Sequence, residues 1–277
     1  MSNVTKTKIM GILNVTPDSF YDGGRYISLD KAFKRALDMY KEGADVIDVG
    51  GESTRPGSSP VSADEEIGRI CPVIEKISRE IGVSVSVDTT KSAVAAEALK
   101  CGAVMINDIS GLSFDKGMAG VAAEHKAELV IMHIKGTPVD MQKNTIYNDL
   151  IQDILDFLAE SASIAISEGV DKSRIIIDPG IGFGKSIEQN YAIINNIERF
   201  TETGFPVLIG LSRKSLISRL YSSEEDRLPA TIALNAVAVS RGAAFIRVHD
   251  VKAHRLAMES IDFLKKTGSS VCYKQRL

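Results

Sequence analysis

The chain has 277 residues, which is enough to bury the core of one large α/β domain or of two smaller ones. Hydrophobic residues make up 44% and charged residues 25%, an ordinary balance that excludes a disordered or low-complexity chain. The formal net charge of −3 leaves no basic footprint for nucleic acid or an anionic membrane, so we expect small-molecule chemistry.

The cysteines and the N-terminal segment indicate a cytoplasmic protein. Cys71, Cys101 and Cys272 are an odd set without CxxC spacing, which predicts neither a disulfide framework nor a zinc site. The first residues lack the apolar stretch of a secretory signal, and no uncharged apolar run is long enough to span a membrane. We therefore expect a cytoplasmic location and no membrane partner.

Short apolar, largely β-branched segments alternate with segments of helical periodicity along the whole chain. The predicted strands span residues 8–14, 45–51, 83–88, 104–108, 129–133, 174–179, 206–212 and 245–250. Helices are predicted over 28–42, from the cap at Ser62 onward, over 91–101 and 147–168, from Ser186 onward, and over 228–241 and 251–265. The strands are near-continuous apolar runs, as is typical of a parallel sheet covered by helices.

Eight strand-helix units without a linker rich in Pro, Gly or Ser favour one α/β domain, a (β/α)8 TIM barrel that spans residues 1–277. The alternative is an open doubly wound sheet. That architecture normally places a glycine-rich fingerprint at the first strand-helix turn. Here the first turn reads NVTPDSFYDGG, which does not match the fingerprint.

The stretch DPGIGFGKS (178–186) looks at first like a phosphate-binding loop. In the GxxxxGK pattern the first glycine would fall at position 179, which is Pro179, and Gly180 is one residue too close. Ser186 and Gln189 form a capping box, which predicts that the helix begins there. We expect the glycines to let the backbone and Phe183 approach a flat ligand, with Asp178 at the end of the preceding strand.

Polar residues recur at the carboxyl ends of the predicted strands, where the active site of a (β/α)8 barrel lies. They are Asn14, Asp48, Asp88, Asn107, Asp108, His133, Asp178, Ser212, Arg213, Lys214, Arg247 and His249. Several also fit purely structural roles. Asp48 and Asp108 could serve merely to orient neighbouring side chains. Lys185 and Arg213 could be solvated loop charges. The recurrence from strand to strand favours a single cavity.

The chemistry of these groups falls into two sets. Asp88, Asn107 and Asp178 offer acceptors and an amide donor, which suit the N–H edge of a heterocycle. Arg55, Arg247 and His249 suit phosphate oxygens, and Asn14 could add an oxygen ligand for a hydrated Mg²⁺.

Eight segments, in order, closely resemble the motifs of the dihydropteroate synthase family, from about residue 8 to residue 265. They are GILNVTPDSF (11–20), DVGGESTRPG (48–57), SVDTTKSAVAAEAL (86–99), INDISG (106–111), IMHIKGTPVDMQ (131–142), DPGIGFGKS (178–186), GLSRKSLI (210–217) and RVHDV (247–251). The resemblance implies a barrel that condenses 6-hydroxymethyl-7,8-dihydropterin pyrophosphate with p-aminobenzoate, giving 7,8-dihydropteroate and pyrophosphate. It also implies a Mg²⁺ cofactor, a homodimer and inhibition by sulfonamides.

The resemblance carries roles to individual positions. Asp88, Asn107, Asp178 and Lys214 would hold the polar edge of the pterin, and Met132, Phe183 and Arg247 would pack around its ring, with Gly210 also among the substrate-binding residues. Asn14, as metal ligand, would act with Arg55, Arg247 and His249 on the pyrophosphate and its Mg²⁺. Asp18, Phe20, Thr54, Arg55 and Pro56 would close over the aromatic amine, and Ser212 would meet its carboxylate.

The implied catalytic residues are Asp18, Arg55, Asp88, Lys214, Arg247 and His249. The leaving pyrophosphate carries concentrated negative charge, which Mg²⁺ and the cationic side chains would stabilise. The electron-rich pterin would delocalise the positive charge left on its methylene, and anionic Asp88 would favour that cation. We therefore expect neither a covalent enzyme intermediate nor an essential general base.

Two other functions share part of the pattern. A pterin-binding methyltransferase barrel explains IND and DPG but leaves NVTPDSF, STRPG and SRKS unused. A non-catalytic pterin-binding paralogue would be expected to lose Asn14, Asp18, Arg55 and His249, which are all intact. Tyr21 stands where a serine is common in the family, whereas the TRPG sequence is intact and predicts a sulfonamide-sensitive enzyme.

Overall fold

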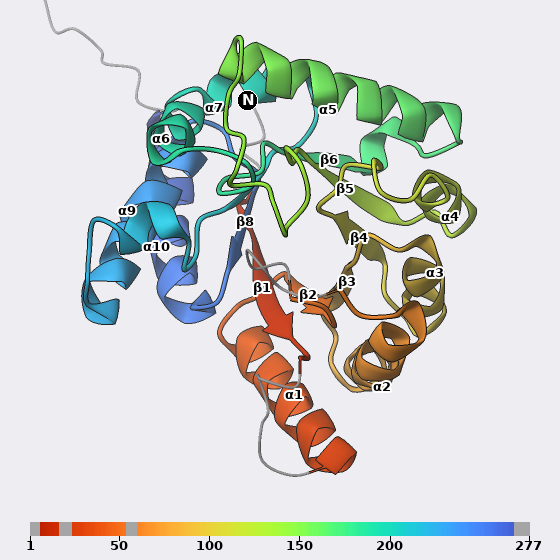
Figure 1. The fold of residues 1–277 in the computed structure, drawn as a ribbon. Helices are drawn as coiled ribbons and strands as arrows, with labels where there is room; N and C mark the ends of the chain where they lie inside the picture. The colour runs from red at the N-terminus through yellow and green to blue at the C-terminus, as the bar shows by residue number, and fades with distance from the viewer. Residues whose placement is uncertain (1–5, 17–23, 54–59, 269–277) are drawn as a thin grey trace, which may run out of the picture.

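Eight parallel strands form one sheet in the computed structural model, in the order β6-β5-β4-β3-β2-β1-β8-β7 (Figure 1). The strands are β1 (Lys8–Asn14), β2 (Val46–Gly50), β3 (Ser84–Asp88), β4 (Met105–Asp108), β5 (Glu128–Met132), β6 (Ile175–Asp178), β7 (Leu208–Gly210) and β8 (Phe245–Val248). A parallel bridge between Ile177 and Val207 joins the two ends of the sheet and closes the barrel. The structure describes residues 6–16, 24–53 and 60–268. The predicted (β/α)8 barrel is confirmed.

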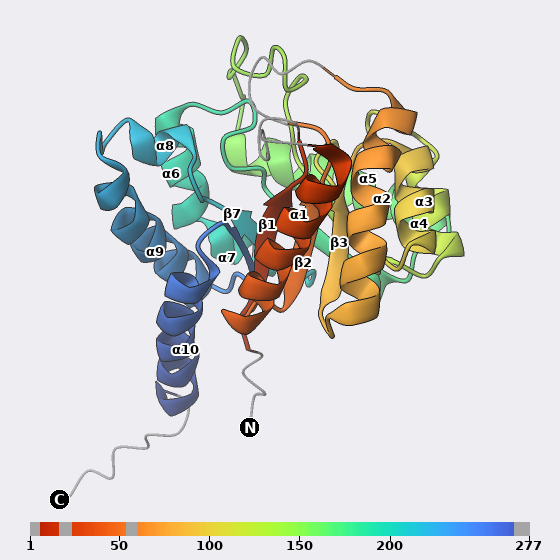
Figure 2. The same cartoon turned by 90° about the horizontal axis from the view of Figure 1, so that it is seen from below.

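Helices surround the barrel on its outside (Figures 1 and 2). They are α1 (Gly24–Lys41), α2 (Ala63–Glu80), α3 (Ser92–Lys100), α4 (Met118–Glu124), α5 (Leu150–Ser167), α6 (Ile187–Asn195), α7 (Ile197–Thr201), α8 (Ser215–Ser218), α9 (Glu224–Ser240) and α10 (Val251–Gly268), with a 3-10 turn over Lys172–Arg174. The predicted helices are confirmed, whereas the short α4, α7 and α8 carry too few turns to show a periodic pattern. Across the described ranges, no helix is both long and apolar enough to cross a membrane.

The strands bury apolar side chains on both faces. Those that point outward, such as Ile9, Ile47 and Val87, pack against the helices in the main core. Those that point inward form a smaller cluster that fills the barrel, made of Met10, Val46, Met105, Val130, Ile176 and Leu208. Because this inner plug is apolar, polar side chains can gather only above it, toward the carboxyl ends of the strands.

The sequence signal at Ser186 fixes the start of α6. The Ser186 hydroxyl accepts a hydrogen bond from the Gln189 N–H (3.2 Å), and the Gln189 side chain accepts one from the Ser186 N–H (2.8 Å). The predicted capping box is thus confirmed, and the glycine-rich loop ends where the helix begins. At the start of α2 only half of a capping box forms. The Ser62 hydroxyl accepts from the Glu65 N–H, but the Glu65 carboxylate pairs with Arg69 instead of returning to the Ser62 N–H.

We expect Ser186→Ala to lower the free energy of unfolding by about 1 kcal/mol, because the first turn of α6 loses a side-chain cap. Urea denaturation measures this change. Ser167→Ala is the matched control, since its exposed hydroxyl donates only to the Ile164 carbonyl in the last turn of α5. Equal effects of the two substitutions would contradict a specific capping role for Ser186.

Candidate active site

Arg247 lies at the centre of a charged cluster above the apolar plug. Its Nε donates to Asp48 Oδ2 (2.6 Å) and its Nη2 donates to Asp88 Oδ2 (2.5 Å). Asn107 Nδ2 donates to the same Asp48 oxygen at 3.0 Å. The sequence left open whether Asp48 only orients neighbours. The structure shows that it holds Arg247 and Asn107 in place from below.

Three buried polar atoms face this cluster without a hydrogen-bond partner among the described residues. They are Asp48 Oδ1, Asp88 Oδ1 and Ser86 Oγ. Buried polar groups are nearly always satisfied in a working protein, so unmet acceptors in a cavity mark a place where a polar ligand fits. Ser86 pairs with Asp48 in the β2–β3 register, so these atoms lie on adjoining strands. Sequence reasoning missed Ser86 because a strand serine carries no distinctive spacing.

Burial shifts the acidity of the site. It raises the pKa of Asp88 to about 7; Arg247 opposes that rise and Asp48 adds to it. Burial also raises the pKa of Asp178, although Lys214 and the Gly180 N–H oppose it. Asp178 is 5% exposed, and its Oδ1 accepts from Gly180 N at 2.7 Å. Two carboxyl groups with raised pKa values in one cavity are typical of a functional site.

The glycines of the 178–186 loop serve the packing of the loop itself. Gly180, Gly182 and Gly184 all have positive φ, at 72°, 83° and 71°. A Cβ on Gly180 would lie 1.9 Å from the His133 carbonyl oxygen, and one on Gly184 would lie 2.7 Å from the Lys135 carbonyl oxygen. These glycines are therefore required by left-handed backbone and by close approach of the loop that follows β5. The expectation that they admit a flat ligand stays a prediction.

Lys185 is buried, which contradicts the interpretation of a solvated loop charge. Its side chain is enclosed by its own loop, where Nζ donates to the carbonyl oxygens of Gly180 and Phe183, both at 2.9 Å. It also lies 2.9 Å from Nδ1 of His133. Burial lowers the pKa of His133 to about 2, with a further contribution from Lys185, so the imidazole is neutral. Arg213, by contrast, is exposed as the alternative predicted.

Phe183 and Lys214 pack against each other at the carboxyl end of the barrel. The Lys214 ammonium lies 4.6 Å from the centre of the Phe183 ring and donates to the Ile181 carbonyl. Phe183 also packs on an apolar group that consists of Ile109, Met132, Ile134 and Met141. The structure therefore brings Phe183, Met132 and Lys214 together. A side chain at Gly210 would begin between Lys214 Nζ (3.7 Å) and Arg247 Cβ (3.8 Å), so glycine keeps that space open.

The remaining predicted residues divide between rim and scaffold. Ser212 Oγ lies 3.0 Å from Nδ1 of His249 at the carboxyl ends of β7 and β8, and α8 beyond it has only four residues. A helix that short has little dipole, so it adds little to anion binding at Ser212. Asp108 accepts from Ser110 N, Ser110 Oγ and Leu112 N, so its role is to hold a turn.

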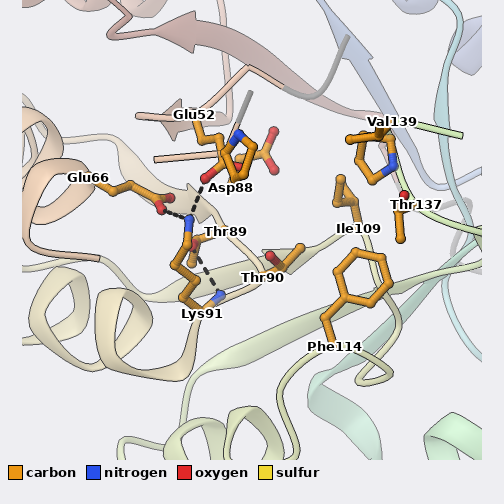
Figure 3. Close-up of a pocket in the computed structure, with 12 residues that line it drawn as sticks. Glu52, Glu66, Asp88, Thr89, Thr90, Lys91, Ile109, Phe114, Thr137 and Val139 are labelled. Atoms are coloured by element: carbon orange, nitrogen blue, oxygen red, sulfur yellow. Dashed lines mark hydrogen bonds and ion pairs between the residues drawn. The ribbon is translucent and has the colours of Figure 1, made fainter. Parts of the chain in front are cut away.

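Five predicted residues lie outside the described part of the chain, so their roles remain predictions. They are Asp18, Phe20, Thr54, Arg55 and Pro56, and Tyr21 lies there as well. A cavity of about 300 Å³ opens between Asp88 and the segments after β4 and β5 (Figure 3). Asn14 is partly exposed at the carboxyl end of β1, beside Gly50 of β2. Within the described ranges no three His, Cys, Asp or Glu residues are grouped to hold a metal.

Comparisons with known proteins agree with this geometry. Residues 10–249 match the model of the family described as pterin binding enzyme. The chain is 48% identical over 269 residues to dihydropteroate synthase of Bacillus subtilis, which covers 97% of this chain and 92% of the relative. The crystal structure of dihydropteroate synthase from Clostridium difficile, in the presence of pteroic acid, superposes with a TM-score of 0.89 at 44% identity, covering 95% and 98% of the two chains.

A second solved structure is that of the Yersinia pestis dihydropteroate synthase in complex with a sulfonamide drug. It superposes with a TM-score of 0.88 at 39% identity and covers 95% of each chain.

We expect Lys185→Met to lower the free energy of unfolding by about 3 kcal/mol, because two buried carbonyl oxygens lose their donor. Chemical denaturation tests this. Lys172→Met is the control: its ammonium lies 5.3 Å from the Phe205 ring, and we expect its loss to change stability by about 0.5 kcal/mol or less. A Lys185 variant as stable as that control would show that the ammonium does not organise the loop.

Proposed function

This chain belongs to the dihydropteroate synthase family of pterin-binding enzymes, and we propose that its cavity condenses 6-hydroxymethyl-7,8-dihydropterin pyrophosphate with p-aminobenzoate, releasing pyrophosphate. The observation that carries this proposal is the gathering of Asp88, Asn107, Asp178, Lys214 and Arg247 at the carboxyl ends of the strands, where hydrogen bonds and charge interactions connect them. The relatives named above, and the pteroic acid present with one of them, support the same reaction.

The pterin is held by its polar edge and by both faces of its ring. Asp178 has one carboxylate oxygen on the Gly180 N–H, which leaves the other available to ring N–H groups. Asn107, fixed through its Nδ2 by Asp48, presents its carbonyl oxygen as an acceptor. Met132 and Phe183 supply the apolar contact, and Arg247 offers its guanidinium plane.

The reaction requires charge to separate between the pterin methylene and the pyrophosphate. Asp88 has one oxygen held by Arg247 and one without a partner among the described residues, and the latter can face the cationic methylene. His249 lies beside Ser212 at the rim, where it can meet phosphate oxygens together with Arg55. The uncharged aryl amine then attacks, so that no side chain forms a covalent bond and no general base is needed.

Mg²⁺ is the proposed cofactor, and the donor chemistry of the rim fits it. Mg²⁺ prefers oxygen ligands, keeps several waters and often binds through one protein group plus substrate phosphates. Asn14 offers such an oxygen at the carboxyl end of β1. When bound, Mg²⁺ would neutralise charge on the leaving pyrophosphate.

The amine subsite lies on the side of Ser212. Its hydroxyl, beside His249, is placed to meet the carboxylate of p-aminobenzoate, with Thr54, Pro56, Asp18 and Phe20 completing the subsite. A sulfonamide resembles that amine in shape and charge, and the Yersinia pestis relative has been solved with one. We therefore propose that sulfonamides inhibit this enzyme by competing with p-aminobenzoate.

A homodimer and a cytoplasmic location complete the proposal. α9 and α10 lie side by side on one flank of the barrel (Figures 1 and 2). They expose the apolar residues Val237, Leu256, Phe263 and Leu264. An apolar surface of this kind suits an interface with a second copy. Cys71 and Cys101 are free thiols, which suits a reducing compartment.

Release of pyrophosphate tests the reaction. We expect release from the pterin pyrophosphate that depends on Mg²⁺ and is accompanied by formation of dihydropteroate when p-aminobenzoate is present. Asp178→Ala should weaken pterin binding at least about tenfold while the fold stays intact, because the ring edge loses its buried acceptor. Calorimetry measures that affinity. An unchanged affinity would exclude the ring-edge role, and no release under any condition would exclude the enzyme.

Pterin affinity should also depend on pH through Lys214. Burial lowers the pKa of Lys214 to about 8; Asp178 opposes this effect and Arg247 adds to it. Below that pH the ammonium donates a charge-assisted hydrogen bond to the pterin, and above it the charge is lost. Affinity should therefore fall as the pH rises from about 8 to about 10.

Lys214→Arg provides the comparison, because a guanidinium stays protonated throughout this range. Titration calorimetry of both proteins with the same pterin separates the effect of Lys214 from any titration of the ligand. An identical decline in the two proteins would contradict the assignment.

A further inference from the structure

An ion-pair cluster that the reaction does not use lies at one edge of the cavity (Figure 3). Lys91 Nζ donates to Glu66 Oε2 at 2.7 Å and also to Glu52 Oε2. The Glu66 side chain is 1% exposed, whereas those of Lys91 and Glu52 are 27% and 25% exposed. Burial alone would lower the pKa of Lys91, but the hydrogen bonds to Glu52 and Glu66 raise it, so the cluster is ionic.

Glu52 links the two ends of the loop between β2 and α2. It lies directly before the loop, and its Oε2 also accepts from the Val61 N–H at 3.3 Å, directly after the loop. Arg69 of α2 donates to the Gly51 carbonyl oxygen at 2.7 Å. Both loop ends are thus attached to the same cluster, and the sequence between them contains Thr54, Arg55 and Pro56.

The anchor of this cluster is rigid. Glu66 is fully buried on α2, and its charge has one cationic partner among the described residues, Lys91. Gly51 packs directly on the helix: a Cβ there would lie 2.8 Å from Ile70 Cγ2 and 3.0 Å from Glu66 Cγ. An exposed ion pair between mobile side chains contributes little, but a pair fixed to a buried carboxylate holds its partners in one geometry.

We propose that Glu52, held by Lys91, is a positioning residue that sets the ends of the 53–60 loop and thereby the affinity for p-aminobenzoate. This inference rests on the proposed function, in which the loop residues contact the amine. Asn107, Asp178 and Lys214 lie on other units of the barrel, and Asp88, although close to Lys91 in sequence, is held by Arg247. Glu52 bonds to Lys91 and Val61 instead, so the clamp acts on the amine more than on the pterin. It is a determinant of selectivity for the amine and for sulfonamides that compete with it.

Glu52→Ala tests the clamp, because it removes both links of the loop and leaves the buried Lys91–Glu66 pair intact. We expect the KM for p-aminobenzoate and the inhibition constant of a sulfonamide to rise together by about tenfold. The affinity for 6-hydroxymethylpterin, measured by calorimetry, should stay within about twofold. Glu97→Ala is the matched control, since Glu97 pairs with Lys100 at 2.8 Å on the exposed face of α3. It should change neither constant.

Lys91→Arg should keep the KM for p-aminobenzoate within about threefold of the wild type, because a guanidinium can still bridge both carboxylates. Lys91→Met in the Glu52→Ala background should raise that KM no further if the lysine acts through Glu52. The inference alone would be overturned if the wild-type enzyme condenses the two substrates and Glu52→Ala has the same KM for p-aminobenzoate as the wild type. Equal losses of amine and pterin affinity would also overturn it. A wild-type protein without condensation would overturn the proposed function instead.

Discussion

The structure depends on a buried cation shared between two carboxylates. Arg247 reaches from β8 to Asp48 on β2 and to Asp88 on β3, across the mouth of the barrel. Burying these charges is costly, and a well-packed apolar cluster would often be as stable or more stable. The cluster is kept above an apolar plug, where β1 pairs with β8 on one side and with β2 on the other, so Arg247 reaches across β1. The same Asp48 oxygen also orients Asn107, so one carboxylate holds two of the residues proposed to contact the substrate.

Two lysines close to Asp178 show how burial assigns different roles to one residue type. Lys185 is enclosed by the carbonyl oxygens of its own loop and determines where Asp178 and Phe183 lie. Lys214 faces the cavity over the Phe183 ring, and burial brings its pKa to about 8, although Asp178 opposes the shift. Lys185 thus acts as a fixed internal hydrogen-bond donor, and burial lowers its pKa well below the usual value. Lys214 remains a titratable donor, which is what recognition of a polar ring requires.

The barrel could be predicted because its strands are continuous β-branched runs and its long helices are periodic; short α4, α7 and α8 offer no such pattern. The residues around the cavity could be predicted because each ends a strand, and ends of parallel strands meet. The hydrogen-bond and ion-pair partners of those residues could not be predicted from the sequence. That Lys185 is buried, that Ser86 lies beside Asp48 without a hydrogen-bond partner among the described residues, and that Glu52 contacts Lys91 depend on distances between segments far apart in the sequence. The glycines were located by sequence, but their positive φ and close contacts required coordinates.

The state of Asp88 connects this architecture to the proposed reaction. Burial raises its pKa to about 7 despite Arg247, so in the free enzyme the carboxylate and its protonated form are close in free energy near neutral pH. A positive charge that develops on the pterin methylene would favour the anion, and the effect is strong because Asp88 is buried. Because Asp48 also holds Arg247, the guanidinium can keep its position when Asp88 gains or loses its proton. The second carboxylate therefore allows Asp88 to respond to the substrate while the rest of the cluster stays in place.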